Sequence, residues 1–257
     1  MTAVKYIQKY SLHIYVYPSR KELGSSAARN VGDTIREMLQ QKDFLNIIFA
    51  AAPSQNEFLE SLRKQQGIEW QRINAFHMDE YVGLPLDAPQ RFGNYLKEHI
   101  FNTLPFYSIN YLNGNGSVNT DEECERYSRL LEQHPVDIVC MGIGENGHIA
   151  FNDPHVADFY DPVLVKQVDL DDACRQQQVN DGCFSSFEKV PTHALTLTIP
   201  ALMKASHLFC MVPGQAKAWA VSHMVNGPVS EDIPATCLRK HEHATIYVDM
   251  ESAAMLG

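Results

Sequence analysis

The segment GIGENGHIAFNDP, residues 142–154, contains the side chains best suited to acid–base chemistry. His148 is surrounded in sequence by oxygen-bearing side chains, namely Glu145, Asn146 and Asp153. A histidine whose second ring nitrogen is held by an oxygen acceptor has a fixed tautomer, and near neutral pH it can both take and give a proton. The segment is therefore a candidate catalytic loop.

The glycines of this loop allow a ligand to come close to its backbone. Gly144 and Gly147 permit backbone conformations that a side chain would forbid, and they allow the chain to offer N–H groups to a ligand. A second interpretation stays open for the same residues. The segment could be a plain tight turn in which His148 only caps a helix.

Asp79 and Glu80 form an acidic pair in FHMDEYVGL, where an apolar run ends. Two adjacent carboxylates at the end of a strand can face a cleft only one at a time, because successive side chains point to opposite faces. One of them could act as a general base while the other supports it. The alternative is an acidic pair at a solvated strand exit, which is common in proteins.

Two further segments could bind an anion. PGQAK, which ends at Lys217, follows the apolar run HLFCMV, so the first N–H groups of the next helix and the lysine could meet a negative charge. Ser54 in AAAPSQNEF has a similar place at another helix start, where it could also be a simple N-cap. Together these segments suggest one pocket for a small anion such as a sugar phosphate.

The remaining histidines could suggest a metal site, since His241 and His243 form an H-x-H pair and His77 lies near Asp79. No H-E-x-x-H motif and no cysteine cluster accompanies them. A solvated loop explains RKHEH, so we expect no metal.

The elements that must position these residues alternate along the chain. Short runs rich in Ile, Val, Phe and Leu predict buried strands in LHIYVY, FLNIIFAAA, INAFHM, DIVCMGI, ALTLTI, HLFCMV and ATIYVDM. Amphipathic segments between them predict helices in residues 22–42, 56–66, 91–102, 120–133 and 214–227. We expect Trp219 on a buried helix face.

This alternation predicts an α/β protein with a three-layer, mostly parallel Rossmann-like sheet and helices on both faces, in a single domain spanning residues 1–257. In such sheets ligands bind beyond the carboxyl ends of the strands. The polar loops at 53–56, 79–84, 144–154 and 213–217 all occupy that position. The longest irregular stretch, from His155 to about Pro191, is expected to be a lid or binding loop.

Composition excludes several classes of partner. The chain has 257 residues, of which 45% are hydrophobic and 20% charged, and a formal net charge of −10. Binding to nucleic acid or to an anionic membrane would need clustered Lys and Arg, so we expect neither. The chain has no apolar stretch long enough for a membrane helix and no signal peptide, which predicts a cytoplasmic protein with its six scattered cysteines reduced.

FHMDEYVGL followed by GIGENGHIAFNDP resembles the glucosamine-6-phosphate deaminase (isomerase) family. VPTHALTLTIPALM and GQAKA match later segments of that family in the same order, so the resemblance covers about residues 45–217. The related 6-phosphogluconolactonases share the fold and a G-x-G-x-x-G-H loop. They are expected to have a Ser-Leu-Phe-Pro ending in place of AFNDP, and Arg in place of Tyr81.

The resemblance implies a cofactor-free reaction on an amino-sugar phosphate. His148 would open the pyranose ring by moving a proton at the ring oxygen. Asp79 would then take the proton from C2 and deliver it to C1, after which ammonia leaves and a ketose phosphate remains. Ser54 and Lys217 fall on the phosphate-binding positions of the family. The amides of the loop around Gly144 and Gly147 would hold substrate hydroxyls.

The chain departs from the family pattern beside the histidine. Asn146 stands where the family usually has Asp, and Asp153 stands where it has the longer Glu. An Asn oxygen can orient the ring, but it brings no negative charge to stabilise an imidazolium. Asp153 could supply that charge, and Glu145 is a second candidate.

The phosphate-binding segments depart as well. The glycine-rich run of the family reads AAAPSQ here, and Arg175 in ACRQQQ is the only nearby candidate for its lid arginines. The substrate could therefore be glucosamine-6-phosphate, galactosamine-6-phosphate or another sugar phosphate, with or without loss of ammonia.

Two other functions stay open at this point. A lactonase would use His148 to activate water, which the residues after the histidine disfavour. A sugar-phosphate sensor without turnover would explain Asn146, although it would need neither Asp79 nor His148. Because the family includes both monomers and hexamers, a homo-oligomer is possible.

Overall fold

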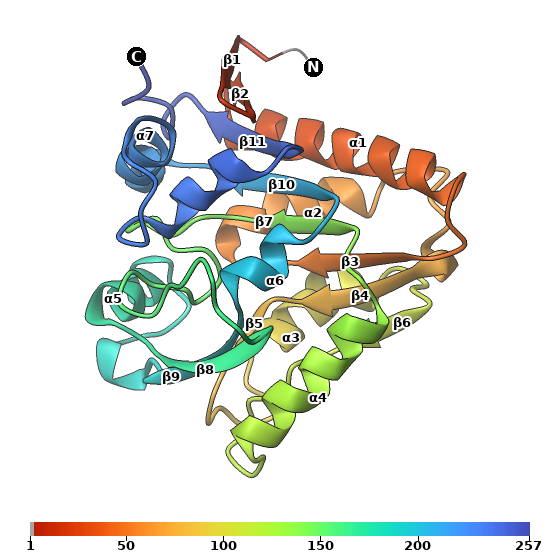
Figure 1. Ribbon diagram of the computed structural model, residues 1–257, viewed down its shortest axis with the longest axis vertical. Helices are drawn as coiled ribbons and strands as arrows, with labels where there is room; N and C mark the ends of the chain where they lie inside the picture. The colour runs from red at the N-terminus through yellow and green to blue at the C-terminus, as the bar shows by residue number, and fades with distance from the viewer. Residues whose placement is uncertain (1–2) are drawn as a thin grey trace.

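A computed structural model describes residues 3–257, and its main sheet contains eight strands. They are β1 (Lys5–Lys9), β2 (Leu12–Tyr17), β3 (Leu45–Phe49), β4 (Ile73–His77), β6 (Ser108–Asn110), β7 (Ile138–Met141), β10 (His207–Val212) and β11 (Ala244–Asp249). Their order in the sheet is β1-β2-β11-β10-β7-β3-β4-β6, and only the β1–β2 pair is antiparallel (Figure 1). The predicted mostly parallel α/β sheet is confirmed.

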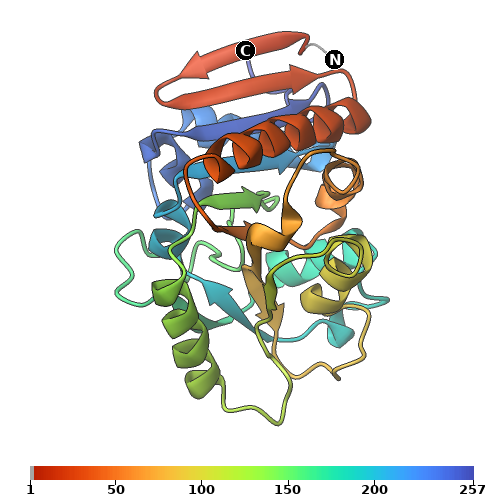
Figure 2. The same ribbon diagram turned by 90° about the vertical axis from the view of Figure 1, so that its right-hand side faces the viewer.

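Helices cover both faces of this sheet, as predicted (Figure 2). On one face pack α1 (Arg20–Leu39), α2 (Asn56–Leu62) and α3 (Phe92–Leu96), and on the other α4 (Thr120–Gln133), α6 (Ile199–Met203) and α7 (Ala218–Asn226). Neighbouring residues of one strand therefore join different cores: Ile47 packs with α1, whereas Ile48 packs with α4 and α6. Burial on both faces explains why these strands read as unbroken apolar runs.

A second, smaller sheet holds β5 (Asp79–Tyr81), β9 (His193–Leu197) and β8 (Val165–Asp169), in the antiparallel order β5-β9-β8. Only Met78 separates β5 from β4, so the chain passes directly from the main sheet into the second one. ALTLTI was expected in the parallel sheet, and that expectation is wrong. This run pairs with β5 and β8 instead, and so its strand is buried away from the main sheet.

Two other expectations need correction. The stretch from His155 to Pro191 is not mainly irregular, because it contains β8 and the helix α5 (Asp172–Asn180). Trp219 is 42% exposed and stacks on His223 at the surface of α7, so it does not lie on a buried face. Both errors come from tertiary contacts that local patterns do not record.

The strand order reverses at the centre of the main sheet. From β3 the chain moves outward to β4 and β6, whereas from β7 it moves in the opposite direction to β10 and β11. β3 and β7 are nevertheless neighbours. The loops that leave their carboxyl ends diverge to opposite sides and leave a crevice, which is where ligands bind in open α/β sheets. Among residues 3–257, every helix is too short or too polar to cross a bilayer.

Candidate active site

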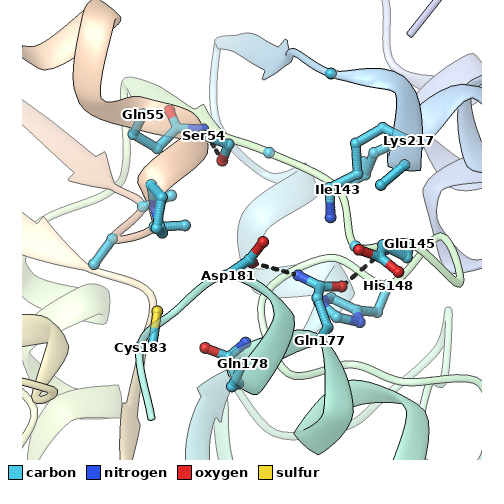
Figure 3. Close-up of a pocket in the computed structure, with 18 of the residues that line it drawn as sticks. Ser54, Gln55, Ile143, Glu145, His148, Gln177, Gln178, Asp181, Cys183 and Lys217 are labelled. Atoms are coloured by element: carbon cyan, nitrogen blue, oxygen red, sulfur yellow. Dashed lines mark hydrogen bonds between the residues drawn. The ribbon is translucent and has the colours of Figure 1, made fainter. Parts of the chain in front are cut away.

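A pocket with a volume of about 220 Å³ lies at this reversal point (Figure 3). Ser54 follows β3, Asp79 begins β5, His148 follows β7 and Lys217 follows β10, and all four line the pocket. Ser54 and Lys217 lie toward the top of the view in Figure 3, and His148 lies lower, beside α5. The structure thus brings together four of the predicted residues from four separate segments.

The His148 ring is fixed by a buried carboxylate. Its Nδ1 lies 2.8 Å from Oδ1 of Asp153, a residue with no exposed surface. Burial opposes ionisation of Asp153, but the charge of His148 and hydrogen bonds from His148 and Asn146 outweigh it and lower the pKa of this carboxyl. The Nδ1 side of the ring therefore faces a negative charge, and the rest of the ring lines the pocket.

Asn146 supports this pair without touching the ring. Its Nδ2 donates to Asp153 Oδ1 at 2.9 Å, and its Oδ1 accepts a hydrogen bond from the backbone N–H of His148 at 3.0 Å. Asn146 therefore orients Asp153 and closes the loop. Of the two candidates for the missing charge, Asp153 rather than Glu145 lies against the imidazole.

Two glycines make room for this arrangement. A Cβ on Gly144 would lie 2.2 Å from Cε1 of His148, so the ring packs directly on the glycine backbone. Gly147 has φ +85°, and a Cβ there would lie 2.7 Å from Ile233. Both positions therefore exclude any side chain, for steric and for conformational reasons. These contacts explain the glycine spacing of the loop.

Asp79 is a buried carboxyl that opens only onto the pocket. The residue is 7% exposed, and within residues 3–257 its side chain accepts no hydrogen bond. Burial, reinforced by the neighbouring charge of Glu80, raises the pKa of Asp79 well above its usual value. A carboxylate with a raised pKa is a stronger base than an ordinary aspartate.

Glu80 lies on the opposite side of β5 and does not line the pocket. Its carboxylate accepts hydrogen bonds from the backbone N–H groups of Tyr81, Phe92 and Gly93, each at 3.0 Å. The sequence predicts Glu80 among the catalytic residues, and the structure does not support that role. The alternation of side chains along the strand separates it from the site and gives it a structural set of partners.

The cationic side of the pocket contains Lys217, which is 7% exposed. Burial lowers its pKa, although the charges of Asp181 and Glu145 oppose this shift. Ser54 lies in the turn Pro53–Gln55, where its Oγ accepts a hydrogen bond from Nε2 of Gln55 at 3.2 Å (Figure 3). Within residues 3–257, the Lys217 ammonium forms no ion pair, so its charge faces the pocket.

Arg20 also lines the pocket, and sequence reasoning missed it. Its guanidinium lies 3.1 Å from a Glu57 carboxylate oxygen and donates to the Pro53 carbonyl at 2.9 Å. These contacts hold it beside the turn that carries Ser54. The signal that could have found it is its place directly after the carboxyl end of β2, at the start of α1.

Arg175 does not reach the pocket, contrary to expectation. Its guanidinium donates to the carbonyls of Phe187 and Val190, both at 3.0 Å, and lies 4.0 Å from the centre of the Phe187 ring. These partners fix the loop that follows α5. Arg175 therefore has a structural role outside the pocket.

The segment expected to be a lid does line the pocket, through α5 and the residues after it. Gln177 accepts a hydrogen bond from the backbone N–H of Glu145 at 2.9 Å and so ties α5 to the histidine loop (Figure 3). Gln178, Asp181 and Cys183 complete this side. None of them was singled out from the sequence, although the run of glutamines in ACRQQQ marks an amide-rich surface.

One group of side chains has the composition of a metal site. The ligand atoms of His148, Asp153 and Cys174 lie within 4.8 Å of one another, and all three residues are buried. His148 and Asp153 already engage each other, and burial raises the pKa of the Cys174 thiol, which disfavours the thiolate that metals prefer. We therefore interpret this group as a hydrogen-bonding set that orients the imidazole.

The main sheet is doubly wound, and a carboxylate and an imidazole meet at its reversal point. These features place the protein in the class of Rossmann-like α/β enzymes that act on a small ligand at the strand ends. Residues 18–247 match the family described as glucosamine-6-phosphate isomerases/6-phosphogluconolactonase. The chain belongs to this family of enzymes.

Curated relatives support this assignment. The chain is 33% identical to a glucosamine-6-phosphate deaminase of Bacillus cereus (strain B4264) over 244 residues, which cover 95% of this chain and 89% of that protein. It is 35% identical to a glucosamine-6-phosphate deaminase of Streptococcus pyogenes serotype M18 over 189 residues, covering 74% of this chain and 78% of the relative.

Two solved structures are similar to this chain. A monomeric glucosamine-6-phosphate deaminase superposes with a TM-score of 0.85 at 29% identity, covering 94% of this chain and 99% of that one. A 6-phosphogluconolactonase from Thermotoga maritima gives a TM-score of 0.75 at 20% identity, covering 93% and 99% of the two chains. The second likeness shows a shared fold.

Proposed function

We propose that this enzyme converts glucosamine-6-phosphate, or its galacto epimer, into the ketose 6-phosphate and ammonia. The observation that carries the proposal is that an unpaired buried carboxyl, Asp79, and a carboxylate-held imidazole, His148, open onto one pocket from different strands. Lys217 supplies a cation to the same pocket. A phosphorylated amino sugar needs these three groups.

In the first step His148 opens the pyranose ring. The protonated imidazole delivers a proton to the ring oxygen as the C1–O5 bond breaks, and the neutral ring then accepts the proton of the C1 hydroxyl, which becomes the aldehyde. Asp153 stabilises the imidazolium, because its buried negative charge lies 2.8 Å from the ring. Asn146 holds Asp153 in place through its amide.

In the second step Asp79 transfers a proton between two carbon atoms. The carboxylate takes the proton from C2 while the His148 imidazolium protonates the aldehyde oxygen, which forms an enolamine. Asp79 then returns its proton to C1, which leaves a protonated imine at C2. Water adds to the imine carbon and ammonia departs, so that the ketose remains. A raised pKa suits this role, because Asp79 must remove a proton from carbon and hold it until C1 receives it.

The phosphate group is expected at the other end of the pocket. Lys217 and Arg20 provide charge there, and Ser54 provides a hydroxyl at the start of a short helical turn. Arg20, and not Arg175, is the arginine that lines this pocket. An oxyanion held by these groups would direct C1 and C2 toward Asp79 and His148.

The test is an assay of the purified protein with glucosamine-6-phosphate and galactosamine-6-phosphate, in which ammonia and ketose phosphate are both measured. Equal amounts of the two products are expected from the preferred epimer. 6-Phosphogluconolactone serves as the parallel substrate. Ketose without ammonia would indicate a plain isomerase, lactone hydrolysis alone a lactonase, and binding without turnover a sensor.

A further inference from the structure

A second cavity, which we call the rear cavity, lies on the side of β5 that Glu80 faces. Its volume is about 650 Å³, and it shares no lining residue with the candidate active site. Cavities of roughly 300–1,000 Å³ are typical of small-molecule sites. Its walls come from β5, α3, α4 and the segment that joins β6 to α4.

The rear cavity contains an arginine whose hydrogen-bonding capacity is unused. The side chain of Arg91 is 8% exposed, and its Nε lies 3.4 Å from Oε2 of Glu80. Across residues 3–257 its guanidinium donates no hydrogen bond, and its nitrogen atoms keep accessible surface where it lines the cavity. These donors are therefore free to bind a ligand that enters the cavity.

The nearby carboxylates do not satisfy Arg91. Glu80 already accepts three backbone hydrogen bonds. Glu123 accepts from Arg126 at 2.6 Å through each of its oxygens and from the backbone N–H of Asn113 at 2.7 Å. Both carboxylates therefore accept their hydrogen bonds from other donors, and Glu80 gives Arg91 only a neighbouring charge at 3.4 Å.

The charge of the rear cavity is positive, although the chain as a whole carries −10. Arg91, Lys97 and Arg126 face Glu80 and Glu123, which leaves one positive charge in excess (3 − 2 = 1). Lys97 lies 4.9 Å from the centre of the Tyr111 ring and forms no ion pair among residues 3–257. An anion would balance this excess.

We propose that the rear cavity is a binding site for a small organic anion, whose carboxylate or phosphate group is held by Arg91 with Lys97 beside it. The planar guanidinium can donate two parallel hydrogen bonds to such a group. The ligand would lie behind the strand that carries Asp79. This inference does not depend on the proposed function, because it uses none of the residues of the active site.

The test is calorimetric titration of the full chain with inorganic phosphate and with acetate, at constant ionic strength. Because the active site is also expected to bind phosphate, the Lys217→Gln variant serves as the background. In that background phosphate should bind the active site about 10-fold more weakly, and we expect one tighter saturable site, for phosphate, acetate or both. The ligand that binds more tightly identifies the recognised group. The absence of saturable binding would overturn the proposal.

Variants locate the site. Arg91→Gln is expected to weaken binding by about 10-fold or more, because charged hydrogen bonds are lost. Lys97→Gln changes an exposed side chain that does not threaten folding, and it should weaken binding about 3-fold. Arg129→Gln, on the exposed surface of α4, is the matched control and should change nothing. Binding that is unaltered by Lys97→Gln and by a folded Arg91→Gln protein would also overturn the proposal.

The result separates this inference from the proposed function. If the protein turns over no amino-sugar phosphate but the Lys217→Gln protein binds the anion through Arg91, the proposed function is wrong and the rear cavity stands. If the protein turns over an amino-sugar phosphate but the Lys217→Gln protein binds no anion through Arg91, the proposed function stands and the rear-cavity proposal is wrong.

Discussion

Asp79 and Glu80 are adjacent acidic residues in one short strand, and both are almost completely buried, yet their surroundings differ. Glu80 has three backbone N–H donors and the Arg91 guanidinium beside it. Asp79 has no donor among residues 3–257 and opens onto the active-site pocket. A buried charge without partners is destabilising, so such a group is evidence of a functional demand rather than a structural one.

The same contrast recurs among the buried cations. Arg175 donates to two backbone carbonyls and fixes a loop, whereas Lys217 forms no ion pair within residues 3–257 and lines the pocket. In both pairs the partnered residue supports the fold. The residue without partners is the one that we place at the substrate, and the following predictions test that division.

The largest expected effect is on catalysis by Asp79. Asp79→Asn should lower the rate of proton exchange at C2 by about 10³-fold or more, because general-base catalysis typically contributes about 10²–10⁴-fold. Substrate affinity should stay nearly constant. Exchange of the C2 proton with deuterium from the solvent, followed by NMR, measures the effect, and persistent exchange would show that another group is the base.

Glu80→Gln should act on stability. One oxygen becomes an NH₂ group that faces backbone donors, and Arg91 loses its counter-charge, so the free energy of unfolding should fall by roughly 3 kcal/mol. Urea unfolding measures this loss. The kcat of the protein that remains folded should stay within about 10-fold of the native value, as expected for a residue outside the pocket. A larger fall in kcat without a loss of stability would break the division between the two carboxylates.

The pH dependence of stability should separate the native protein from Asp79→Asn. The pKa of Asp79 is raised above its usual 3.8 by burial and by Glu80, so the folded state binds this proton more tightly than the unfolded state does. The stabilising contribution of Asp79 is therefore fully present at low pH. It is lost as the pH rises from the pKa of Asp79 in the unfolded state, about 3.8, through its higher pKa in the folded state.

At neutral pH the Asp79→Asn protein should accordingly unfold at a higher temperature than the native protein. We expect a gain of roughly a few degrees, because a buried carboxylate without hydrogen-bond donors is replaced by a neutral amide. Thermal unfolding from pH 4 to pH 8 measures it. If both proteins show the same pH profile, Asp79 is not the unpaired group described here.

Asn146→Asp tests whether the histidine loop lacks charge. The new carboxylate would lie against Asp153, where the Asn146 amide now donates at 2.9 Å. Two carboxylates at this distance cannot both ionise freely, so we expect no gain in kcat and a loss of about 1–2 kcal/mol in stability. A marked gain in kcat would instead show that Asp153 does not supply the charge that the imidazole needs.

The smallest effect is expected on substrate affinity. Lys217→Gln should raise KM by about 10-fold, which corresponds to the loss of one charge-assisted contact with phosphate. Arg175→Gln is the matched control, because it removes a cation outside the pocket. It should leave KM unchanged, while the loop after α5 becomes more open to proteolysis. Steady-state kinetics on both variants provide the measurement, and equal changes in KM would contradict the assigned roles.

Much of the fold was predictable because its strands are buried on both faces and follow one another with helices between them. Runs such as HLFCMV are typical of strands that are buried on both faces of a parallel sheet. The position of the site followed from the same rule, since Ser54, His148 and Lys217 all come directly after strands of the main sheet. Local sequence therefore indicated where chemistry would occur.

The details within the site were not predictable, because they depend on contacts between distant segments. Alternation along β5 shows that Asp79 and Glu80 point apart, but only the packing of α3 shows which of them is engaged. The sequence does not show that the Arg175 guanidinium donates to the carbonyls of Phe187 and Val190, which keeps it from the ligand. The roles of Asn146 and Asp153 depend on a turn that no periodic pattern describes.

The central reversal of the main sheet also constrains how the chain must fold. Asp79 arrives from the half of the sheet that begins at β3, and His148 from the half that begins at β7, so neither half alone can assemble the pocket. Pairings between residues far apart in sequence form late in folding. Recovery of turnover after dilution from denaturant should therefore follow the docking of the two halves, and helices should form within each half before any turnover appears.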